Sequence, residues 1–416
     1  MEREKTINVG IGFVTGRKNF RKVLRTYVYR WKQTGAAIRK RARLHLFVAY
    51  DLEYSNTQVD DYVNIRQDIL DVLDSALFIG KSKIHNETIS LAQQRVVSLP
   101  EAELLFEKGY AGKRNAVLYH AIRQKMDCLI FMDDDEYPLA VIKTGGAPWW
   151  CGQDVFASHL KYLAEADITN GYHCGYISPV PYIDFLETFS EDDFRLFIKA
   201  ISNDILEWDT IRRVMEKGGV TYADPQVFAD NAAREVPEVN RTKFISGSNL
   251  GINLKEPERV LPFFNPPRAR GEDTFLSTCL SDRKVLRIPC YTFHDGFSVY
   301  SDLLEGVLPL ELKRIHAKNE STVNRFYRAC LGWVRYKPLY SFITNPDGYE
   351  VQAAKNRERL KTILPKFCTY FQNDSFMKIL AEYNHYHNNV KVHRRLFQEN
   401  LRIWENVREY AVGQSF

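Results

Sequence analysis

The sequence predicts an α/β protein with a mostly parallel β-sheet, and three observations carry that prediction. Strand-like and helix-like patterns alternate through residues 7–132, an order that favours a parallel sheet with helices on both faces. A short apolar run at residues 128–132 has the length of a buried strand. Polar or charged residues follow three of the expected strands, and ligands of such sheets bind beyond the carboxyl ends of the strands.

The expected elements of the first part follow from hydrophobic periodicity. Strands are expected at residues 7–14, 44–50 and 128–132. Helices are expected at residues 19–31, 60–73 and 115–125. The three strands end at Thr15-Gly16-Arg17, at Asp51 and at Asp133. We therefore expect these three segments to converge on one edge of the sheet.

The rest of the chain changes character twice. Residues 184–219 carry apolar residues at helical spacing up to Gly218-Gly219, which predicts a helical insertion with a packed apolar stripe. Strand-like segments then return at residues 243–245, 250–254 and 285–289, the last ending at Pro289. From residue 303 the pattern is helical. We expect one domain at residues 1–302 and a helical region at residues 303–416.

The most informative segment is the acidic cluster after the strand at residues 128–132. Asp133, Asp134, Asp135 and Glu136 are consecutive, and Pro138 ends the segment. Carboxylates at the end of a buried strand repel one another unless a cation neutralises them, and hard oxygen ligands suit Mg²⁺ or Mn²⁺. A solvated acidic turn is the plain alternative. The preceding strand and an upstream basic segment favour a metal–diphosphate site.

Composition narrows the classes of function. The 416 residues have a formal net charge of +5, which suits an anionic ligand but is too weak to indicate nucleic-acid binding. No apolar run reaches the length of a transmembrane helix, and no apolar leader precedes the first strand. The seven cysteines form no CxxC pair, so neither a zinc site nor a disulfide framework is indicated. A cytoplasmic location is expected.

Four landmarks together resemble the GT-A glycosyltransferases, in particular those of family 2. Asp133-Asp134-Asp135 is similar to the DXD motif of that class, and Lys113-Arg114-Asn115 precedes it. Gly271-Glu272-Asp273 is similar to the ED motif, and His294 stands where many members carry a late metal-binding histidine. The resemblance covers residues 7–297. It implies a Rossmann-like GT-A fold, a Mn²⁺ or Mg²⁺ ion, and a nucleoside diphosphate sugar as donor.

The resemblance also implies roles for individual residues. Metal ligands are expected among Asp133, Asp135 and His294. Residues expected to bind the donor are Thr15, Arg17, Asp51, Lys113, Arg114, Asn115, Asp133 and Asp134. Plain alternatives stand beside several of these: His294 as a structural histidine, Lys113 and Arg114 as surface charge at a helix start, and Asp51 as a turn cap.

Asp273 is the candidate catalytic base, because an acceptor hydroxyl must lose its proton as it attacks the anomeric carbon. Glu272 beside it is an acceptor contact or a cap, since acids also favour helix N-termini. The small residues 246–249 (SGSN) allow backbone to approach a sugar or simply form a hairpin turn. Trp149 and Trp150 suit an acceptor-stacking wall, but core packing is the preferred interpretation.

The expected function is metal-dependent transfer of a sugar to a carbohydrate or other hydroxyl acceptor, with inversion if Asp273 is the base. A retaining enzyme needs no such base and stays an alternative. A sugar-phosphate nucleotidyltransferase is another, although residues 14–18 (VTGRK) are not glycine-rich; a non-catalytic carbohydrate-binding protein is a third. For residues 303–416 a helical cap is preferred over contact with a membrane surface or a second subunit.

Overall fold

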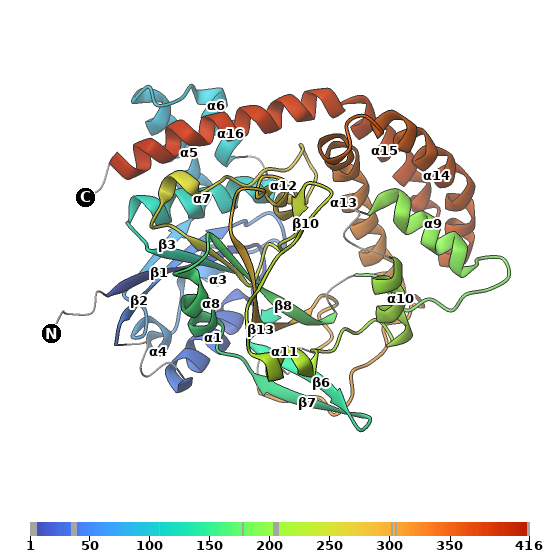
Figure 1. Ribbon diagram of the computed structural model, residues 1–416, viewed down its shortest axis with the longest axis horizontal. Helices are drawn as coiled ribbons and strands as arrows, with labels where there is room; N and C mark the ends of the chain where they lie inside the picture. Colours follow the sequence, from blue (N-terminus) through green and yellow to red (C-terminus); the bar gives the residue numbers. More distant parts are fainter. Residues whose placement is uncertain are drawn as a thin grey trace.

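A computed structural model describes residues 6–34, 40–107, 109–176, 179–202, 208–300, 303 and 306–413. A large twisted sheet lies between layers of helices, and a group of helices stands at one end of it (Figure 1). The strand order is β3-β2-β1-β4-β12-β8-β13-β5, with β9 paired to β13. The predicted mixed α/β class with a mostly parallel sheet is confirmed.

The first four strands run parallel and match the predicted positions where a prediction existed. They are β1 (Ile7–Thr15), β2 (Ala42–Tyr50), β3 (Ser75–Ile79) and β4 (Cys128–Met132). Strand β1 pairs with β2 on one side and with β4 on the other. The chain therefore moves outward from β1 in both directions, and the β1–β4 junction is a topological switch point, where ligands of open α/β sheets bind.

The second half of the sheet contains the reversed strands. Strand β12 (Leu250–Asn253) runs antiparallel between β4 and β8 (Ile168–Tyr176). Strand β13 (Val285–Asp295) is parallel to β8, and the two-residue strands β5 (Glu136–Tyr137) and β9 (Arg234–Glu235) run antiparallel to β13. Strands β4, β8 and β13 therefore all point to the same carboxyl edge.

The prediction that the strand at residues 285–289 ends at Pro289 is wrong. Strand β13 continues to Asp295, and its register against β8 shifts between Arg287 and Tyr291. Proline cannot donate a ladder hydrogen bond, and such an irregularity accommodates it within a strand. The consequence for the site is direct, because His294 lies within the sheet and not in a loop after it.

Alternate residues of the strands enter two cores on opposite faces of the sheet. Ile11 of β1 and Ile130 of β4 pack with helices α1 (Phe20–Thr34) and α8 (Val155–Leu163). Leu129 and Phe131 pack on the other face. The helices of that other face are α5 (Lys81–Gln93), α6 (Leu99–Phe106) and α7 (Gly109–Arg123), joined by α16 (Val390–Gly413).

Two predicted helices differ from those observed. The single helix expected at residues 60–73 is two short ones, α3 (Asp60–Val63) and α4 (Gln67–Leu70), because the backbone leaves the helical region at Asn64. Helix α7 begins at Gly109, six residues before the expected start. Lys113, Arg114 and Asn115 therefore lie inside a helix, and their side chains are held by its neighbours.

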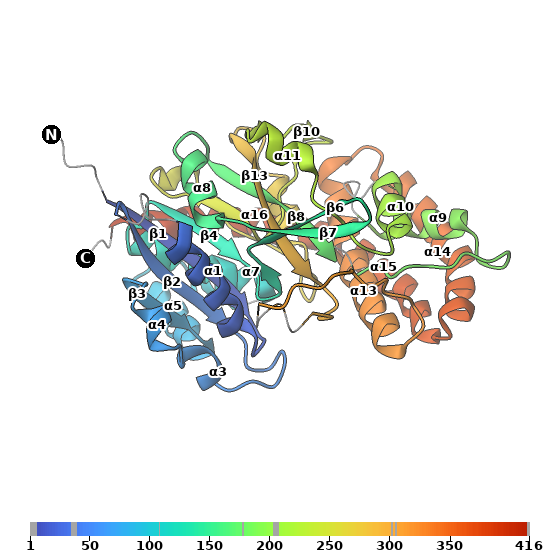
Figure 2. The ribbon, with the colours of Figure 1, turned by 90° about the horizontal axis from the view of Figure 1, so that it is seen from below.

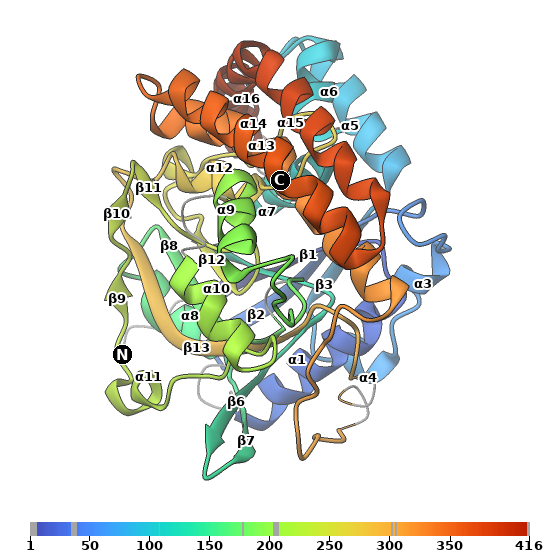
Figure 3. The ribbon, with the colours of Figure 1, turned by 90° about the vertical axis from the view of Figure 1, so that its right-hand side faces the viewer.

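The predicted helical insertion and the carboxyl-terminal helices share one aromatic core. Helices α9 (Glu191–Ile201) and α10 (Trp208–Glu216) pack with α13 (Glu320–Thr344), α14 (Tyr349–Phe371) and α15 (Lys378–Asn388). Ile205 and Leu206 of the predicted stripe, and the expected domain boundary at residue 302, lie outside the described residues. Figures 1 and 3 show this helical group at one end of the sheet.

Smaller elements complete the chain. They are β6 (Leu139–Thr144), β7 (Ala147–Gly152), α11 (Pro225–Asp230), β10 (Glu238–Val239), β11 (Thr242–Lys243), α12 (Glu272–Ser277) and the 3₁₀ turns Pro257–Arg259 and Asp374–Met377. Strands β6 and β7 form a hairpin that projects from the sheet at the bottom of Figures 1 and 3. None of the described helices is long and apolar enough to cross a membrane.

Candidate functional site

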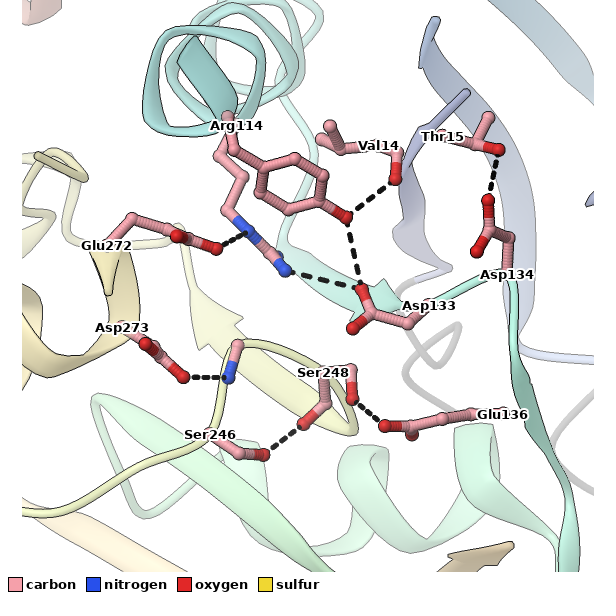
Figure 4. Close-up of polar contacts among 12 residues, drawn as sticks. Val14, Thr15, Arg114, Asp133, Asp134, Glu136, Ser246, Ser248, Glu272 and Asp273 are labelled. Atoms are coloured by element: carbon pink, nitrogen blue, oxygen red, sulfur yellow. Dashed lines mark hydrogen bonds and ion pairs between the residues drawn. The ribbon is translucent and has the colours of Figure 1, made fainter. Parts of the chain in front are cut away.

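The candidate site lies at the carboxyl edge, where β1, β4 and β13 end. Thr15 closes β1, Asp133 follows β4, and His294 is the penultimate residue of β13. These three strands are distant in sequence. Strand β1 pairs with β4, and β12 and β8 connect β13 to the same sheet in the same direction. Parallel pairing of β1 with β2 and with β4 confirms the predicted convergence of Thr15-Gly16-Arg17, Asp51 and Asp133 at one edge. Figure 4 shows the residues around Asp133 and Asp134.

Arg17 and Thr15, just after β1, hold the middle of the acidic cluster. The Arg17 guanidinium lies 2.8 Å from Asp134 Oδ1 and 2.5 Å from Asp135 Oδ2. Thr15 Oγ1 donates a hydrogen bond of 2.5 Å to Asp134 Oδ2. Burial raises the pKa of Asp134 to about 6, although Arg17 opposes that shift. The guanidinium thus supplies positive charge that these two carboxylates need.

His294 approaches the same cluster from β13. Its Nε2 lies 3.5 Å from Asp135 Oδ1. Burial by itself would lower the pKa of His294, but Asp135 outweighs it and raises that pKa to about 9. In return, His294 and then Arg17 overcome the effect of burial on Asp135 and lower its pKa below the usual range. At neutral pH this pair is an imidazolium and a carboxylate.

Asp133 sits on the side of the cluster that faces α7. Arg114 Nη2 lies 3.3 Å from Asp133 Oδ1, and the Tyr110 hydroxyl is 3.5 Å from the same oxygen. Tyr110 also donates to the carbonyl of Val14 at 2.7 Å. Burial raises the pKa of Asp133 to about 8, with Arg114 opposing and neighbouring acids adding to the shift. A cation at this edge would therefore compete with a proton on Asp133.

Arg114 links the two acidic motifs that the sequence singled out. Its side chain is 2% exposed, and its Nε lies 3.2 Å from Glu272 Oε1. The guanidinium also stacks near the ring of Phe131, 4.9 Å from its centre. Arg114 thus forms ion pairs with Asp133 and Glu272 at the same time. Through Arg114, the DXD-like segment at residues 133–135 is connected to the ED-like segment at residues 272–273.

Lys113 and Asn115 are both committed to partners within the protein. Lys113 Nζ forms an ion pair of 2.9 Å with Asp51 Oδ2, so the two predicted donor-binding residues meet. Asn115 is 1% exposed. Its amide bonds the carbonyls of Leu105 and Phe263 and accepts from the Phe263 N–H. These contacts fasten the loop around Phe263 to α7.

Asp273 lies in the first turn of α12, next to the loop between β11 and β12. Its Oδ2 accepts from the Gly247 N–H at 3.1 Å, and its Oδ1 accepts from the Thr274 N–H at 2.8 Å. Burial and then Glu272 raise the pKa of Asp273 to about 6. The predicted helix start at Glu272-Asp273 is confirmed. A carboxylate with this pKa suits proton transfer near neutral pH.

Glu136, a member of the predicted acidic cluster, and His173 had no predicted role in the site. Glu136 is buried, accepts a hydrogen bond of 2.7 Å from Thr292 Oγ1 and another from Ser248 Oγ, and lies 3.3 Å from His173 Nε2. His173 overcomes the effect of burial and lowers the pKa of Glu136 to about 2. The acidic run in the sequence indicated that Glu136 belongs to the site. No local pattern indicated His173, which reaches this edge because it lies in strand β8.

The segment at residues 246–249 is a polar loop of the site. Ser248 contacts Glu136, and Gly247 leaves little room, since a Cβ there would lie 2.9 Å from Arg114 Nη2. The two tryptophans separate. Trp150 packs against Phe293 at 5.0 Å between ring centres, whereas Trp149 is 64% exposed. The preferred core placement of Trp149 is therefore wrong, because β7 alternates its faces and only one of them meets the protein.

The donor set at this edge suits a divalent cation in its chemistry. Carboxylate oxygens and a neutral imidazole are ligands of Mn²⁺, and carboxylates alone suit Mg²⁺. Within the described residues, however, no group of three or more His, Cys, Asp or Glu side chains is arranged to hold a metal. Arg17 contacts both Asp134 and Asp135. A cation shared by these carboxylates would require Arg17 to turn away.

Comparison with known proteins adds no assignment. No family model matches the chain, and no curated protein matches it.

Proposed function

We propose that this protein is a metal-dependent glycosyltransferase of GT-A fold that transfers a sugar from a nucleoside diphosphate sugar to an acceptor hydroxyl. One observation carries the proposal. Asp133–Asp135, His294 and the Glu272-Asp273 pair come from separate segments and meet at the switch point of a mostly parallel sheet. Ligands of such sheets bind at that point.

The excess of acidic groups at this edge of the sheet also supports binding of a cation, and with it an anionic ligand. Three aspartates and a glutamate are consecutive there, and two of them have pKa values raised to about 8 and about 6. Raised values mean that the charged forms are not fully compensated by the protein. Asp133, Asp135 and His294 are not arranged around a metal here, and they would hold a divalent ion only after Arg17 turns away from Asp135. Such an ion would offset charge on a departing diphosphate.

The chain's own groups account for the proton in the transfer. The acceptor oxygen forms a bond to the anomeric carbon, the bond from that carbon to the diphosphate oxygen breaks, and its electron pair leaves with the diphosphate. The acceptor proton passes to Asp273, whose pKa of about 6 suits a base. The Gly247 and Thr274 N–H groups fix that carboxylate.

A donor-hydrolysis screen tests the proposal. The full chain is incubated with UDP-, GDP-, dTDP- and CMP-linked sugars and Mn²⁺ or Mg²⁺, and release of nucleotide and free sugar is measured. We expect metal-dependent release with at least one donor and loss of release in Asp135→Ala. Asp192→Ala is the matched control, because Asp192 is 74% exposed and its ion pair among the described residues is with Arg195 of its own helix.

Other outcomes decide against the proposal. Release of pyrophosphate from a nucleoside triphosphate and a sugar phosphate, without donor hydrolysis, would identify a nucleotidyltransferase. Saturable sugar binding with no turnover of any donor would identify a carbohydrate-binding protein. Activity that is unchanged by chelation would remove the metal from the mechanism.

A further inference from the structure

Arg325 of the carboxyl-terminal helical region reaches toward the candidate site. It lies in the second turn of α13, and its guanidinium carbon is 5.8 Å from the centre of the Phe297 ring. Phe297 follows His294 by three residues. Figures 1 and 2 show α13 at the end of the sheet toward which β8 points. A helix outside the region that resembles glycosyltransferases thus places a cation near the acids.

One polar group of Arg325, its Nε, is not satisfied by the described residues. Its Nε is buried and has no hydrogen-bond partner among the described residues. No carboxylate of the described chain lies within ion-pair distance of it. A buried donor left without a partner is unfavourable, and more so when the group is charged. Such a group calls for an explanation, and a ligand is one.

Two further arginines lie in the same place. Arg270 donates to the Tyr54 hydroxyl at 3.2 Å, and Arg270 and Arg17 together outweigh the effect of partial burial and lower the pKa of Tyr54. Burial lowers the pKa of Arg325 as well, and the nearby Arg17 and Arg270 act in the same direction while Asp135 opposes them. Of these three arginines, only Arg17 has a described carboxylate partner.

Arg270 contacts the hydroxyl of Tyr54, which is 53% exposed, and Arg17 and Arg325 both lie near enough to Tyr54 and Asp135 to interact with their charges. Guanidinium groups match the oxygens of phosphate in paired hydrogen bonds, which makes clustered arginines typical of phosphate sites. The contact between the Arg325 guanidinium and the Phe297 ring explains why the side chain lies where it does. It does not explain a buried Nε without a partner or the gathering of like charges.

We propose that Arg325, together with Arg270 and Arg17, binds a diphosphate group at the carboxyl edge, so that residues outside the resemblance complete the site. The proposal rests on the glycosyltransferase function for the identity of that diphosphate, namely the leaving group of a nucleoside diphosphate sugar. In this arrangement Arg17 exchanges its carboxylate partners for phosphate oxygens as a cation joins Asp135. Arg325 then acts as a binding residue, and α13 becomes a wall of the donor site.

Calorimetric titration of the full chain with inorganic pyrophosphate and Mg²⁺ tests the proposal. Arg325→Gln should weaken pyrophosphate binding roughly tenfold or more, as expected for the loss of hydrogen bonds to a charged group. Arg325→Lys should recover part of it, because the charge stays and the paired geometry is lost. Arg328→Gln, one turn further along α13 and exposed, should bind like the parent protein.

A second variant protects the test against misfolding. Arg270→Gln changes an exposed residue and should weaken pyrophosphate binding in the same way, while thermal unfolding by circular dichroism compares all variants. Equal pyrophosphate affinity in Arg325→Gln, Arg270→Gln and Arg328→Gln would overturn the proposal, as would absence of pyrophosphate binding to the parent. If Arg325→Gln weakens pyrophosphate binding but no sugar nucleotide is hydrolysed, the anion site stands and the glycosyltransferase function fails.

Discussion

The carboxyl edge of the sheet and the core of the helical group enclose opposite kinds of side chain. At the edge, Asp133, Asp134 and Glu136 are held by cations and hydroxyl groups within a few ångströms. In the helical group, Phe367 is fully buried and its ring centre lies 3.9 Å from that of Phe197 and 4.9 Å from that of Phe189.

The difference shows which part of the molecule stabilises and which part acts. Buried charge is unfavourable unless it is compensated, and it is common at functional sites. Aromatic packing contributes stability without chemistry. We therefore expect substitutions at the edge to remove binding or turnover while the protein stays folded, and substitutions in the helical core to lower the free energy of unfolding.

The largest expected effect is on metal binding at the edge. Asp135→Ala removes the carboxylate that pairs with both His294 and Arg17. The affinity for Mn²⁺ should fall more than roughly 100-fold, since even groups that only support a ligand are worth about 10–100-fold. Isothermal titration with Mn²⁺, with and without UDP or GDP, measures this. Nucleotide binding that is equally tight without metal in the parent protein would refute the metal site.

Turnover should respond strongly to Asp273. Asp273→Asn keeps the size of the side chain and should lower kcat about 10²–10⁴-fold, with donor and metal binding nearly unchanged. Because the pKa of Asp273 is raised to about 6, the parent rate should fall as the pH drops below about 6, where the base is protonated. Asp282→Asn, a substitution of a 74% exposed acid, is the control.

The stereochemistry of the product sharpens the assignment of Asp273. Inversion at the anomeric carbon, read from proton NMR coupling constants, is expected if Asp273 deprotonates the acceptor. A retained configuration would leave Asp273 without that role. A loss of donor affinity in Asp273→Asn would also contradict it, because it would mean that the carboxylate mainly positions the Gly247 loop.

In the helical core, Phe367→Ala should lower the free energy of unfolding by about 3–5 kcal/mol, as large-to-small changes at buried aromatic positions do. Urea denaturation followed by circular dichroism measures the change. The affinity for Mn²⁺ should stay within a factor of about two, because the site lies on other elements. A large loss of Mn²⁺ affinity in a folded Phe367→Ala variant would contradict the separation of the two regions.

The smallest expected effect is the pH dependence of metal binding. Asp135 raises the pKa of His294 to about 9, so below that pH the ring carries a proton that a coordinating cation must displace. Metal affinity should therefore rise with pH, by up to about tenfold per unit, until about pH 9. His294→Ala should flatten this dependence in Mn²⁺ titrations at several pH values. An unchanged slope would assign the displaced proton to Asp133 instead.

Much of the sheet could be predicted because its signals are local. The apolar run at residues 128–132 is β4 residue for residue, and β1 and β2 include the strands predicted at residues 7–14 and 44–50. The strand end at Pro289 was predicted wrongly, because proline disfavours a continuing strand. Here the strand continues past an irregularity in its register. The break at Asn64 likewise follows from backbone geometry that the apolar pattern does not report.

The residues of the site also divide into those that local sequence patterns indicate and those that only the tertiary structure brings there. The acids after β4 and the Glu272-Asp273 pair are contiguous motifs, so the sequence indicated them. His173 and Arg325 come from β8 and α13, and each reaches the edge through tertiary packing alone. No spacing rule connects residue 173 or residue 325 with residue 135. Only the three-dimensional arrangement shows that Arg114 serves Asp133 and Glu272 at once.

Helix α16 has a consequence for how the protein is made. Ile403, Trp404 and Val407 pack in the same core as α6, α7 and the strand residues Leu129 and Phe131, and Trp404 Nε1 donates to the Val260 carbonyl at 2.8 Å. During synthesis the sheet's strands emerge long before this helix does. Until residues 390–413 leave the ribosome, one face of the α/β layer keeps apolar surface exposed, a condition that favours aggregation or chaperone binding.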